Sequence, residues 1–227
     1  MRSAVVVFPG SNCDHDCLRG LRELGNQPVD ALWHKDAVDL DGYDLIVLPG
    51  GFSYGDYLRS GAIARYAPIM SSLKRAVDRG QTVLGICNGF QILLEAQFLP
   101  GAMQVNQSLK FICKPTMLRV ERDDTRFTSG YGKGEEISIP VAHREGNYFC
   151  DDETLARLQG EGQILFRYVD NPNGAIDSIA GIMNNAGNVL GMMPHPERAL
   201  RERIGSTDGI PLFRSILESL GSREGRS

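Results

Sequence analysis

The sequence predicts an α/β fold in which helices cover both faces of a largely parallel sheet. Two observations carry this expectation. Short runs of apolar residues alternate with segments of helical periodicity through residues 4–96, and these runs are apolar throughout, as is typical of strands buried on both faces. Residues 111–182 carry shorter and more alternating runs, which predict an added antiparallel section of sheet.

The first part of the chain is expected to consist of strand–helix units. A strand at 4–8 precedes a helix at 16–24, whose leucines recur at helical spacing and which stops at a glycine. A second strand at 44–49 is followed by a helix at 68–79 that begins on a proline. This order is typical of a flavodoxin-like, doubly wound sheet, in which ligands bind at the carboxyl ends of the strands.

The second part of the chain is expected to supply the antiparallel strands and to close the fold. The antiparallel strands are expected at 117–121, 136–140 and 164–168. A further strand at 188–191 and a helix at 210–220 follow. Because no linker or repeat divides the chain, we expect residues 1–220 to form a single domain and residues 221–227 a flexible C-terminal tail.

Composition limits the classes of function. The 227 residues are 42% apolar, which suffices for a full core, and the net charge of −4 without a basic run argues against a nucleic-acid partner. The longest apolar run, at 4–8, is too short to cross a membrane, and no signal peptide is expected. Five cysteines in no metal-type pairs favour a reduced, cytoplasmic location without a metal site. We expect Cys13 and Cys17 to be packing residues.

Cys87 lies where an apolar strand at 82–86 meets a helix expected at 90–96. Gly85 and Gly89 bracket it in the G-x-nucleophile-x-G spacing of an elbow that exposes a nucleophile on a strained turn. The start of the helix would favour the reactive thiolate. The alternative is a small cysteine that only fills space in the core.

The base that such a nucleophile needs is expected at His195. This residue follows the strand at 188–191, and Pro194 and Pro196 fix the backbone around it. In extended chain, Glu197 falls on the same side as His195 and can accept a hydrogen bond from one imidazole nitrogen while the other faces the sulfur. If each residue is considered alone, the simpler interpretation is that His195 is a loop histidine and Glu197 a solvated charge.

A third segment follows the strand at 44–49, where Gly50 and Gly51 are adjacent. Attack of a thiolate on an amide carbonyl creates an oxyanion, which preformed donors must meet. The amides of Gly51 or Phe52, together with that of Asn88, are the candidates. By itself, a strand that ends in two glycines also fits a simple turn or a phosphate cradle.

Together these motifs resemble the class I glutamine amidotransferases, whose signature is a Gly-x-Cys-x-Gly-x-Gln elbow and a distal His-Pro-Glu. Gln91 completes the first motif and Pro196 the second. Within this class the chain is similar, nearly end to end, to the glutaminase subunits of phosphoribosylformylglycinamidine synthases. That resemblance rests on segments 9–14, 50–64, 85–91, 143–148 and 193–198. The run Gly-Phe-Ser-Tyr-Gly-Asp at 51–56 is the most discriminating part of it.

The resemblance implies that Cys87 is the nucleophile, His195 the general base and later acid, and Glu197 the orienting carboxylate. It also implies that L-glutamine is hydrolysed to glutamate and ammonia through a thioester. Residues expected to contact glutamine or its oxyanion are Gly50, Gly51, Phe52, Asn88 and Gln91.

The same resemblance implies a partner and a pathway. The ammonia would pass to a large synthetase subunit that converts formylglycinamide ribonucleotide to the amidine in purine biosynthesis. ATP and magnesium are expected on that subunit, with no cofactor in this chain, and a small third subunit is left open. Two alternatives remain at this point, namely a non-catalytic relative and a thiol hydrolase that acts on γ-glutamyl peptides without a partner.

Three further segments are weighed against simpler readings. Asn106 and Ser108 could contact the amino-acid end of the substrate or form a plain polar turn. The segment 9–16 is a candidate interface with the synthetase, unless Asn12 or Asp14 merely caps a helix. His143 and Glu145 are expected at the edge of the site or at an interface, because nothing in the sequence places a nucleophile beside them.

Overall fold

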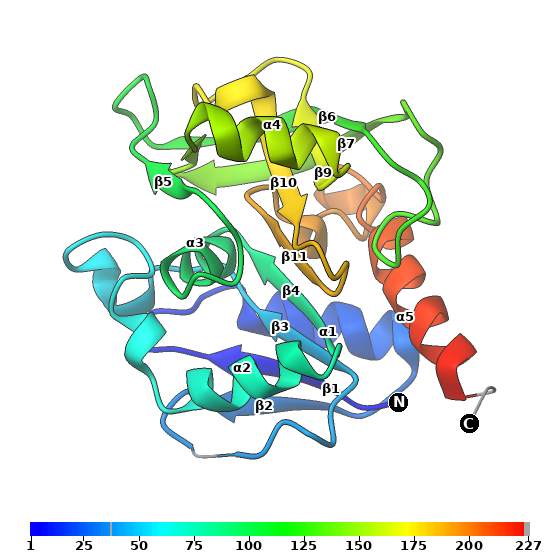
Figure 1. Cartoon of the computed structure of the whole chain (residues 1–227). Coiled ribbons are helices and arrows are strands. Elements are labelled where there is room, and N and C mark those ends of the chain that lie inside the picture. The colour runs from blue at the N-terminus through cyan, green and yellow to red at the C-terminus, as the bar shows by residue number, and fades with distance from the viewer. Residues whose placement is uncertain (37, 225–227) are drawn as a thin grey trace.

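The computed structural model describes residues 1–36 and 38–224. In this part of the chain a nine-stranded sheet has the order β2-β1-β3-β4-β11-β10-β9-β6-β7, and β5 pairs with β8 in a small separate sheet (Figure 1). The predicted α/β class, with a largely parallel doubly wound sheet and an added antiparallel section, is confirmed.

Five adjacent strands are parallel and form one half of the sheet. They are β2 (Val29–Trp33), β1 (Ser3–Val7), β3 (Leu45–Leu48), β4 (Thr82–Ile86) and β11 (Val189–Met192). The strands β3, β4 and β11 are buried along their whole length, which accounts for their uninterrupted apolar sequences.

The other half of the sheet is antiparallel and joins the parallel half where β10 pairs with β11. Its strands are β10 (Ile179–Met183), β9 (Ile164–Tyr168), β6 (Ile112–Val120) and β7 (Glu136–His143). The small sheet consists of β5 (Ala102–Gln104) and β8 (Asn147–Phe149). The strands β10, β9, β6 and β7 therefore extend the main sheet.

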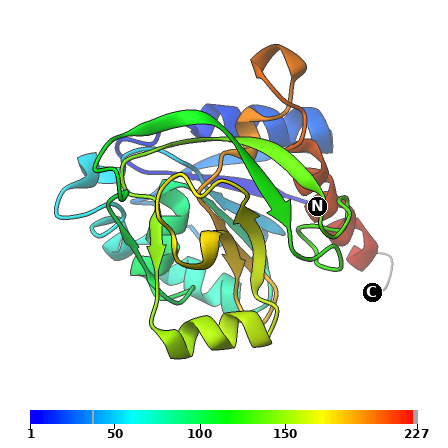
Figure 2. The same cartoon turned by 90° about the horizontal axis from the view of Figure 1, so that it is seen from above.

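The parallel half is covered by helices on both faces. These helices are α1 (Asp14–Gly25), α2 (Ile69–Asp78), α3 (Asn88–Glu95) and α5 (Ile210–Glu224). Seen from above, α1 and α5 lie on one face of the sheet, and α2 and α3 lie on the other (Figure 2). A further helix, α4 (Asp152–Gly160), belongs to the antiparallel part of the molecule (Figure 1).

Several elements depart from the predicted ones. The strands β2 and β10 and the helix α4 were not predicted, because β2 is a half-exposed edge strand, a glycine interrupts β10, and α4 fully buries only Leu158. The helix α5 continues to Glu224, so the predicted start of the tail at 221 falls inside it. Residues 225–227 of that tail lie outside the described residues. No helix in the described residues is long and apolar enough to span a membrane.

The topology brings three distant segments to one edge of the sheet. In the parallel half, Leu48 lies opposite Gly85, and Met192 lies opposite Ile86. The turns that follow β3, β4 and β11 therefore leave the sheet side by side at the carboxyl ends of these strands. This edge is where ligands bind in doubly wound sheets.

Candidate active site

Cys87 occupies the turn between β4 and α3 and is the N-cap residue of α3. Its backbone has φ of 49° and ψ of −104°, a conformation that is strained for a residue with a side chain. The amide of Cys87 donates to the carbonyl of Met192 at 2.7 Å, which fastens the elbow to β11. The side chain is 5% exposed, and its sulfur lies 3.8 Å from the carbonyl oxygen of Ala142.

The two glycines of the elbow are required by close backbone contacts. A Cβ at Gly89 would overlap the carbonyl oxygen of Leu48 on the neighbouring strand, and a Cβ at Gly85 would lie 2.8 Å from the carbonyl oxygen of Gly89. The helix can therefore start this close to the sheet only with glycine at both positions. This packing holds Cys87 at the tip of the turn.

His195 and Glu197 form a buried pair beside the elbow. His195 Nδ1 lies 2.7 Å from Glu197 Oε1, and each residue is 2% exposed. The backbone amide of His195 donates to the carbonyl of Pro140 at 2.8 Å, so β7 helps to fix its position. His195 Nε2 has no hydrogen-bond partner in the described residues. It is the nitrogen left available for proton transfer.

The electrostatics of this pair favour the charged imidazolium. Burial acts to lower the pKa of His195, but the carboxylate of Glu197 and the sulfur of Cys87 outweigh it and hold the pKa well above its ordinary value. The geometry and charge therefore match those of a Cys-His-Glu triad.

The predicted oxyanion donors differ in their availability. The amide of Phe52 already donates to the carbonyl of Gly10 at 2.9 Å, whereas the amide of Gly51 makes no hydrogen bond in the described part of the chain. The amide of Asn88 lies at the start of α3, where backbone donors are free of intrahelical partners. Gly51 and Asn88 are thus the pair that can meet an oxyanion.

Gly50, Asn88 and Gln91 position other groups of the site. The carbonyl of Gly50 accepts from the amide of Cys13 at 3.2 Å, and a Cβ at Gly50 would lie 2.7 Å from Cε1 of His195. The Asn88 side chain accepts from the amide of Ser53 at 3.0 Å and donates to Gln91 Oε1 at 2.9 Å. Gln91 Nε2 in turn donates to the carbonyl of Glu145.

A cavity of about 320 Å³ opens in front of Cys87, at the lower end of the size range of small-molecule sites. Both halves of the molecule contribute to its lining, which includes Gly51, Phe52, Asp56, Cys87, Gln91, His143 and Glu145. His143 and Glu145, which were expected at the edge of the site or at an interface, therefore line the same cavity as Cys87.

Asn106 and Ser108 lie outside the lining of this cavity. Asn106 is fully buried, where its side chain accepts from the amide of Gly146 at 3.0 Å and donates to the carbonyl of His143 at 3.0 Å. Ser108 is exposed, and its hydroxyl oxygen accepts from the amide of Lys110. Asn106 thus holds the segment that carries His143 in place.

Cys13 has a position that the sequence did not reveal. It is the N-cap residue of α1, which has no side-chain cap, so the alternative in which Asn12 or Asp14 caps this helix does not apply. Its sulfur lies 3.8 Å from His195 Nδ1 and accepts a hydrogen bond from Arg198 at 3.1 Å. Cys13 is buried, as a packing residue should be, but it packs against the triad.

One group in the described residues has donor atoms close enough to hold a metal ion, namely Cys13, His195 and Glu197, whose atoms lie within 4.8 Å of one another. The sulfur of Cys13 is already contacted by the guanidinium of Arg198, and His195 Nδ1 is engaged with Glu197. Both interactions would have to be given up for a cation. The present contacts therefore suit a hydrogen-bonded cluster better than a metal site.

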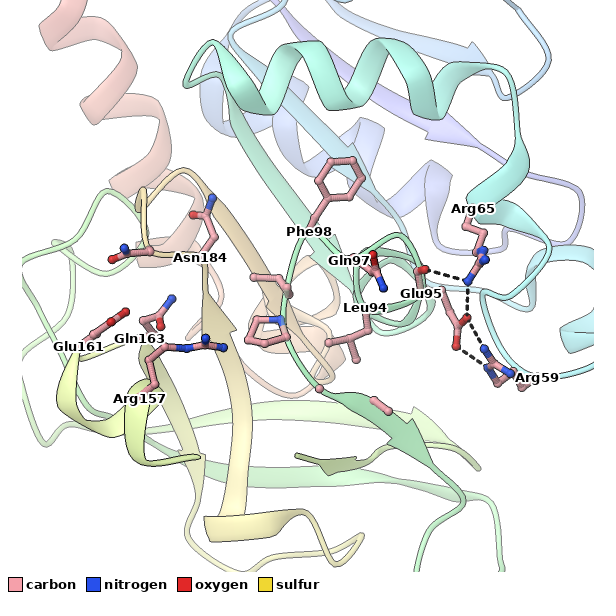
Figure 3. A pocket seen from close by; sticks show the side chains of 15 residues that line it. Arg59, Arg65, Leu94, Glu95, Gln97, Phe98, Arg157, Glu161, Gln163 and Asn184 are labelled. Carbon is pink, nitrogen blue, oxygen red and sulfur yellow. Dashed lines mark hydrogen bonds and ion pairs between the residues drawn. The ribbon is translucent and has the colours of Figure 1, made fainter. Parts of the chain in front are cut away.

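A larger hollow of about 640 Å³ lies away from these groups (Figure 3). It borders the C-terminal end of α3, whereas Cys87 precedes the N-terminal end, about 12 Å away along the helix. Arg59 and Arg65 beside it are both paired with Glu95. This hollow contains none of the residues of the triad.

Comparison with known proteins agrees with this geometry. Residues 1–207 match the model of the CobB/CobQ-like glutamine amidotransferase domain, and the chain belongs to this family of glutamine amidotransferases. It is similar to a chain in the structure of PurLQS from Thermotoga maritima, with 47% identity and a TM-score of 0.87 over 96% of this chain and 98% of that one.

Two more distant structures share the fold. A putative GMP synthase subunit from Thermoplasma acidophilum is 20% identical, with a TM-score of 0.69 over 100% of this chain and 97% of that one. A glutamine amidotransferase from Thermotoga maritima is 15% identical, with a TM-score of 0.59 over 100% of this chain and 92% of that one. At these identities the likeness concerns the fold alone.

Proposed function

We propose that this chain is the glutaminase subunit of a phosphoribosylformylglycinamidine synthase. The observation that carries the glutaminase activity is the buried His195–Glu197 pair beside a strained cysteine elbow at the mouth of a cavity. The likeness to a chain of PurLQS, at 47% identity over nearly the full length of both chains, supports the particular synthase.

The first half of the reaction acylates the enzyme. The Cys87 thiolate attacks the side-chain amide carbon of L-glutamine, and the amides of Gly51 and Asn88 stabilise the oxyanion. The imidazolium of His195 gives its Nε2 proton to the amide nitrogen as the carbon–nitrogen bond breaks. Ammonia leaves, and a γ-glutamyl thioester remains on Cys87.

The second half restores the enzyme. The neutral imidazole of His195 takes a proton from water, which attacks the thioester carbon. The carbon–sulfur bond breaks, and glutamate is released with Cys87 again paired with the imidazolium. Glu197 holds the ring orientation and stabilises the positive charge throughout.

The useful product would be ammonia. In this proposal it passes to a large synthetase subunit that converts formylglycinamide ribonucleotide to formylglycinamidine ribonucleotide, with ATP and magnesium bound there. A small third subunit is compatible with this assembly. Pure chain incubated with ATP should show no stoichiometric binding, and a tight ATP site would contradict this division of labour.

The deciding experiment measures glutamine turnover by the pure chain with and without a purified synthetase subunit. We expect slow turnover alone and acceleration in the complex, because free glutaminase activity would waste glutamine. Equal rates in both samples would contradict the partnered function. Fast hydrolysis of γ-glutamyl peptides by the chain alone would favour a thiol hydrolase, and no turnover in either sample would favour a non-catalytic protein.

A further inference from the structure

The cavity in front of Cys87 has an acidic wall that the triad does not use. Asp56, from the 3₁₀ turn Ser53–Asp56, and Glu145, from the segment after β7, both line the cavity. Oδ1 of Asp56 is buried and has no hydrogen-bond partner in the described residues. Only one oxygen of Glu145 is engaged there, by the amide of Ser60 at 3.2 Å.

The two carboxylates act on each other. Burial and the charge of Glu145 raise the pKa of Asp56 to about 6, although a hydrogen bond from Ser60 opposes this. Arg144 also lines the cavity, but neither Asp56 nor Glu145 forms an ion pair in the described residues. The repulsion between two carboxylates is unfavourable in a partly buried site. A bound cation would relieve this repulsion and fill the unpartnered oxygen.

His143 supplies an independent sign that a ligand belongs on this wall. It is 3% exposed and lines the same cavity, yet its Nε2 has no partner in the described residues. Its Nδ1 lies 3.1 Å from Oδ1 of Asn106, whose amide group donates elsewhere, so Nδ1 must carry the proton. Nε2 is therefore a free acceptor, and burial, with the nearby charge of His195, lowers the pKa of His143 to about 4.

The acidic wall is held at a fixed place relative to the nucleophile. Gln91 lies one turn along α3 from Cys87, and its side-chain amide donates to the backbone carbonyl of Glu145. The helix that presents the sulfur at its start thus also anchors the segment that carries Glu145. This contact therefore fixes the distance between Cys87 and the acidic wall, and with it the length of a ligand that can reach from one to the other.

We propose that Asp56 and Glu145 together bind the α-ammonium group of the substrate and so select a free amino acid for attack by Cys87. An ammonium carries one positive charge and three donors, which suits two carboxylates with oxygens to spare. A metal ion is a poorer occupant, because the acceptor atoms of Asp56, His143 and Glu145 do not all lie within 4.8 Å of one another. This inference rests on the proposed glutaminase function.

The test compares two amides in the assembled synthetase complex, L-glutamine and glutaramic acid, which lacks the α-amino group. The variants are Asp56→Asn and Glu145→Gln. Asparagine tolerates the left-handed backbone at position 56, where φ is 53°, and glutamine can still accept from the amide of Ser60. Glu161→Gln, at the exposed rim of the larger hollow, is the matched control.

We expect each variant to lower kcat/KM for glutamine by about 10- to 100-fold, mainly through KM, as for a lost charge-assisted hydrogen bond. The rate with glutaramic acid should change less than about threefold, since that substrate has no group for the wall to bind. The control should resemble the wild type with both amides.

Equal losses with both amides would show a merely structural role and overturn the inference, as would an unchanged preference for glutamine in both variants. The wild-type complex provides the separate check on the proposed function. If it turns over glutamine and the preference does not move in the variants, only the α-ammonium assignment fails. If it does not turn over glutamine, the glutaminase function itself fails.

Discussion

The two sides of the candidate active site differ in how the charges of their side chains are balanced. On the parallel side, Glu197 is bonded to His195, and the charge of the imidazolium is matched by the carboxylate and the sulfur. On the other side, the carboxylates of Asp56 and Glu145 form no ion pair in the described residues, and Asp56 and His143 each keep a buried atom without a partner there. His195 Nε2 and Glu197 Oε2 also lack hydrogen-bond partners among the described residues, so the difference lies in charge. The charges of the His195–Glu197 pair balance each other within the chain, whereas we infer that a ligand balances those of the carboxylates.

The difference follows from the elements that build each wall. The triad stands on turns that leave buried parallel strands, where the backbone is fixed by strand pairing and by close glycine contacts. The recognition groups come from a 3₁₀ turn with left-handed residues and from the segment after an antiparallel strand. The triad thus stands where strand pairing and close backbone contacts fix the geometry that its chemistry needs.

The largest effect should come from removing the nucleophile. Cys87→Ala should lower glutamine-dependent synthesis by about 10⁴- to 10⁶-fold, because no other atom can form the thioester. The mutant complex should still make the amidine when it is given an ammonium salt, since the sulfur takes no part in that step. Cys113→Ala, at an exposed cysteine, is the control and should be unaffected. Failure of ammonia to rescue a properly assembled complex would break the assignment.

Removing the charge of Glu197 should lower the rate less than removing the sulfur of Cys87. Glu197→Gln keeps the shape but removes the charge and disturbs imidazole orientation, so we expect a loss of about 10²- to 10⁴-fold in kcat. Glu202→Gln, at an exposed glutamate nearby in sequence, should leave kcat unchanged. Steady-state rates with saturating glutamine provide the comparison, and equal rates in the two variants would contradict the role of Glu197.

Displacing the ring of His195 slightly, with Glu197 intact, should lower kcat less again. In Gly50→Ala the new methyl group would lie 2.7 Å from Cε1 of His195 and would push the ring out of line. A shift of this size is expected to lower kcat by about 10- to 100-fold. Gly160→Ala, where a Cβ meets nothing within 4 Å, should behave as wild type. A fully active Gly50→Ala enzyme would show that the ring position matters less than we infer.

The ionisation of His143 and Asp56 should affect how the free energy of unfolding depends on pH. The pKa of His143 is about 4 in the folded chain and about 6.5 when unfolded, so the unfolded state binds the proton first as the pH falls. Stability from this group is therefore present above pH 6.5 and is lost between about pH 6.5 and 4. Asp56, with a pKa of about 6, acts in the opposite direction, because the folded state takes up its proton first.

His143→Gln isolates the histidine contribution. Between pH 7 and pH 5 the wild type should lose about 2 kcal/mol more unfolding free energy than the variant, as measured by urea denaturation. An identical pH dependence in both proteins would mean that His143 is not held neutral in the folded chain.

The parts of the site that the sequence predicted are those with local signatures. The elbow around Cys87 is defined by glycines two residues away, and His195 and Glu197 are two residues apart, so their geometry could be inferred from backbone periodicity. The place of Cys13 beside His195 joins residues 182 positions apart and has no local signal. The internal role of Asn106, which holds the segment of His143, was missed for the same reason.

The unpredicted elements of the fold have a similar explanation. The edge strand β2 and the helix α4 expose much of their surface, so their apolar patterns are weak. The acidic wall was missed because Asp56 and Glu145 lie on different segments and meet only through the loop and the end of β7. Tertiary contacts between loops are the part of a site that sequence patterns describe least.

The central claim is that Cys87 carries a γ-glutamyl thioester during turnover, and one measurement tests it most directly. The synthetase complex is mixed with L-glutamine, quenched with acid within the first turnovers, and digested for peptide mass spectrometry. We predict a γ-glutamyl adduct on the peptide that contains Cys87, its absence from enzyme incubated without glutamine, and its disappearance once glutamine is consumed. Ammonia release without any adduct, or an adduct on Cys13 or Cys113 in place of Cys87, would contradict the account.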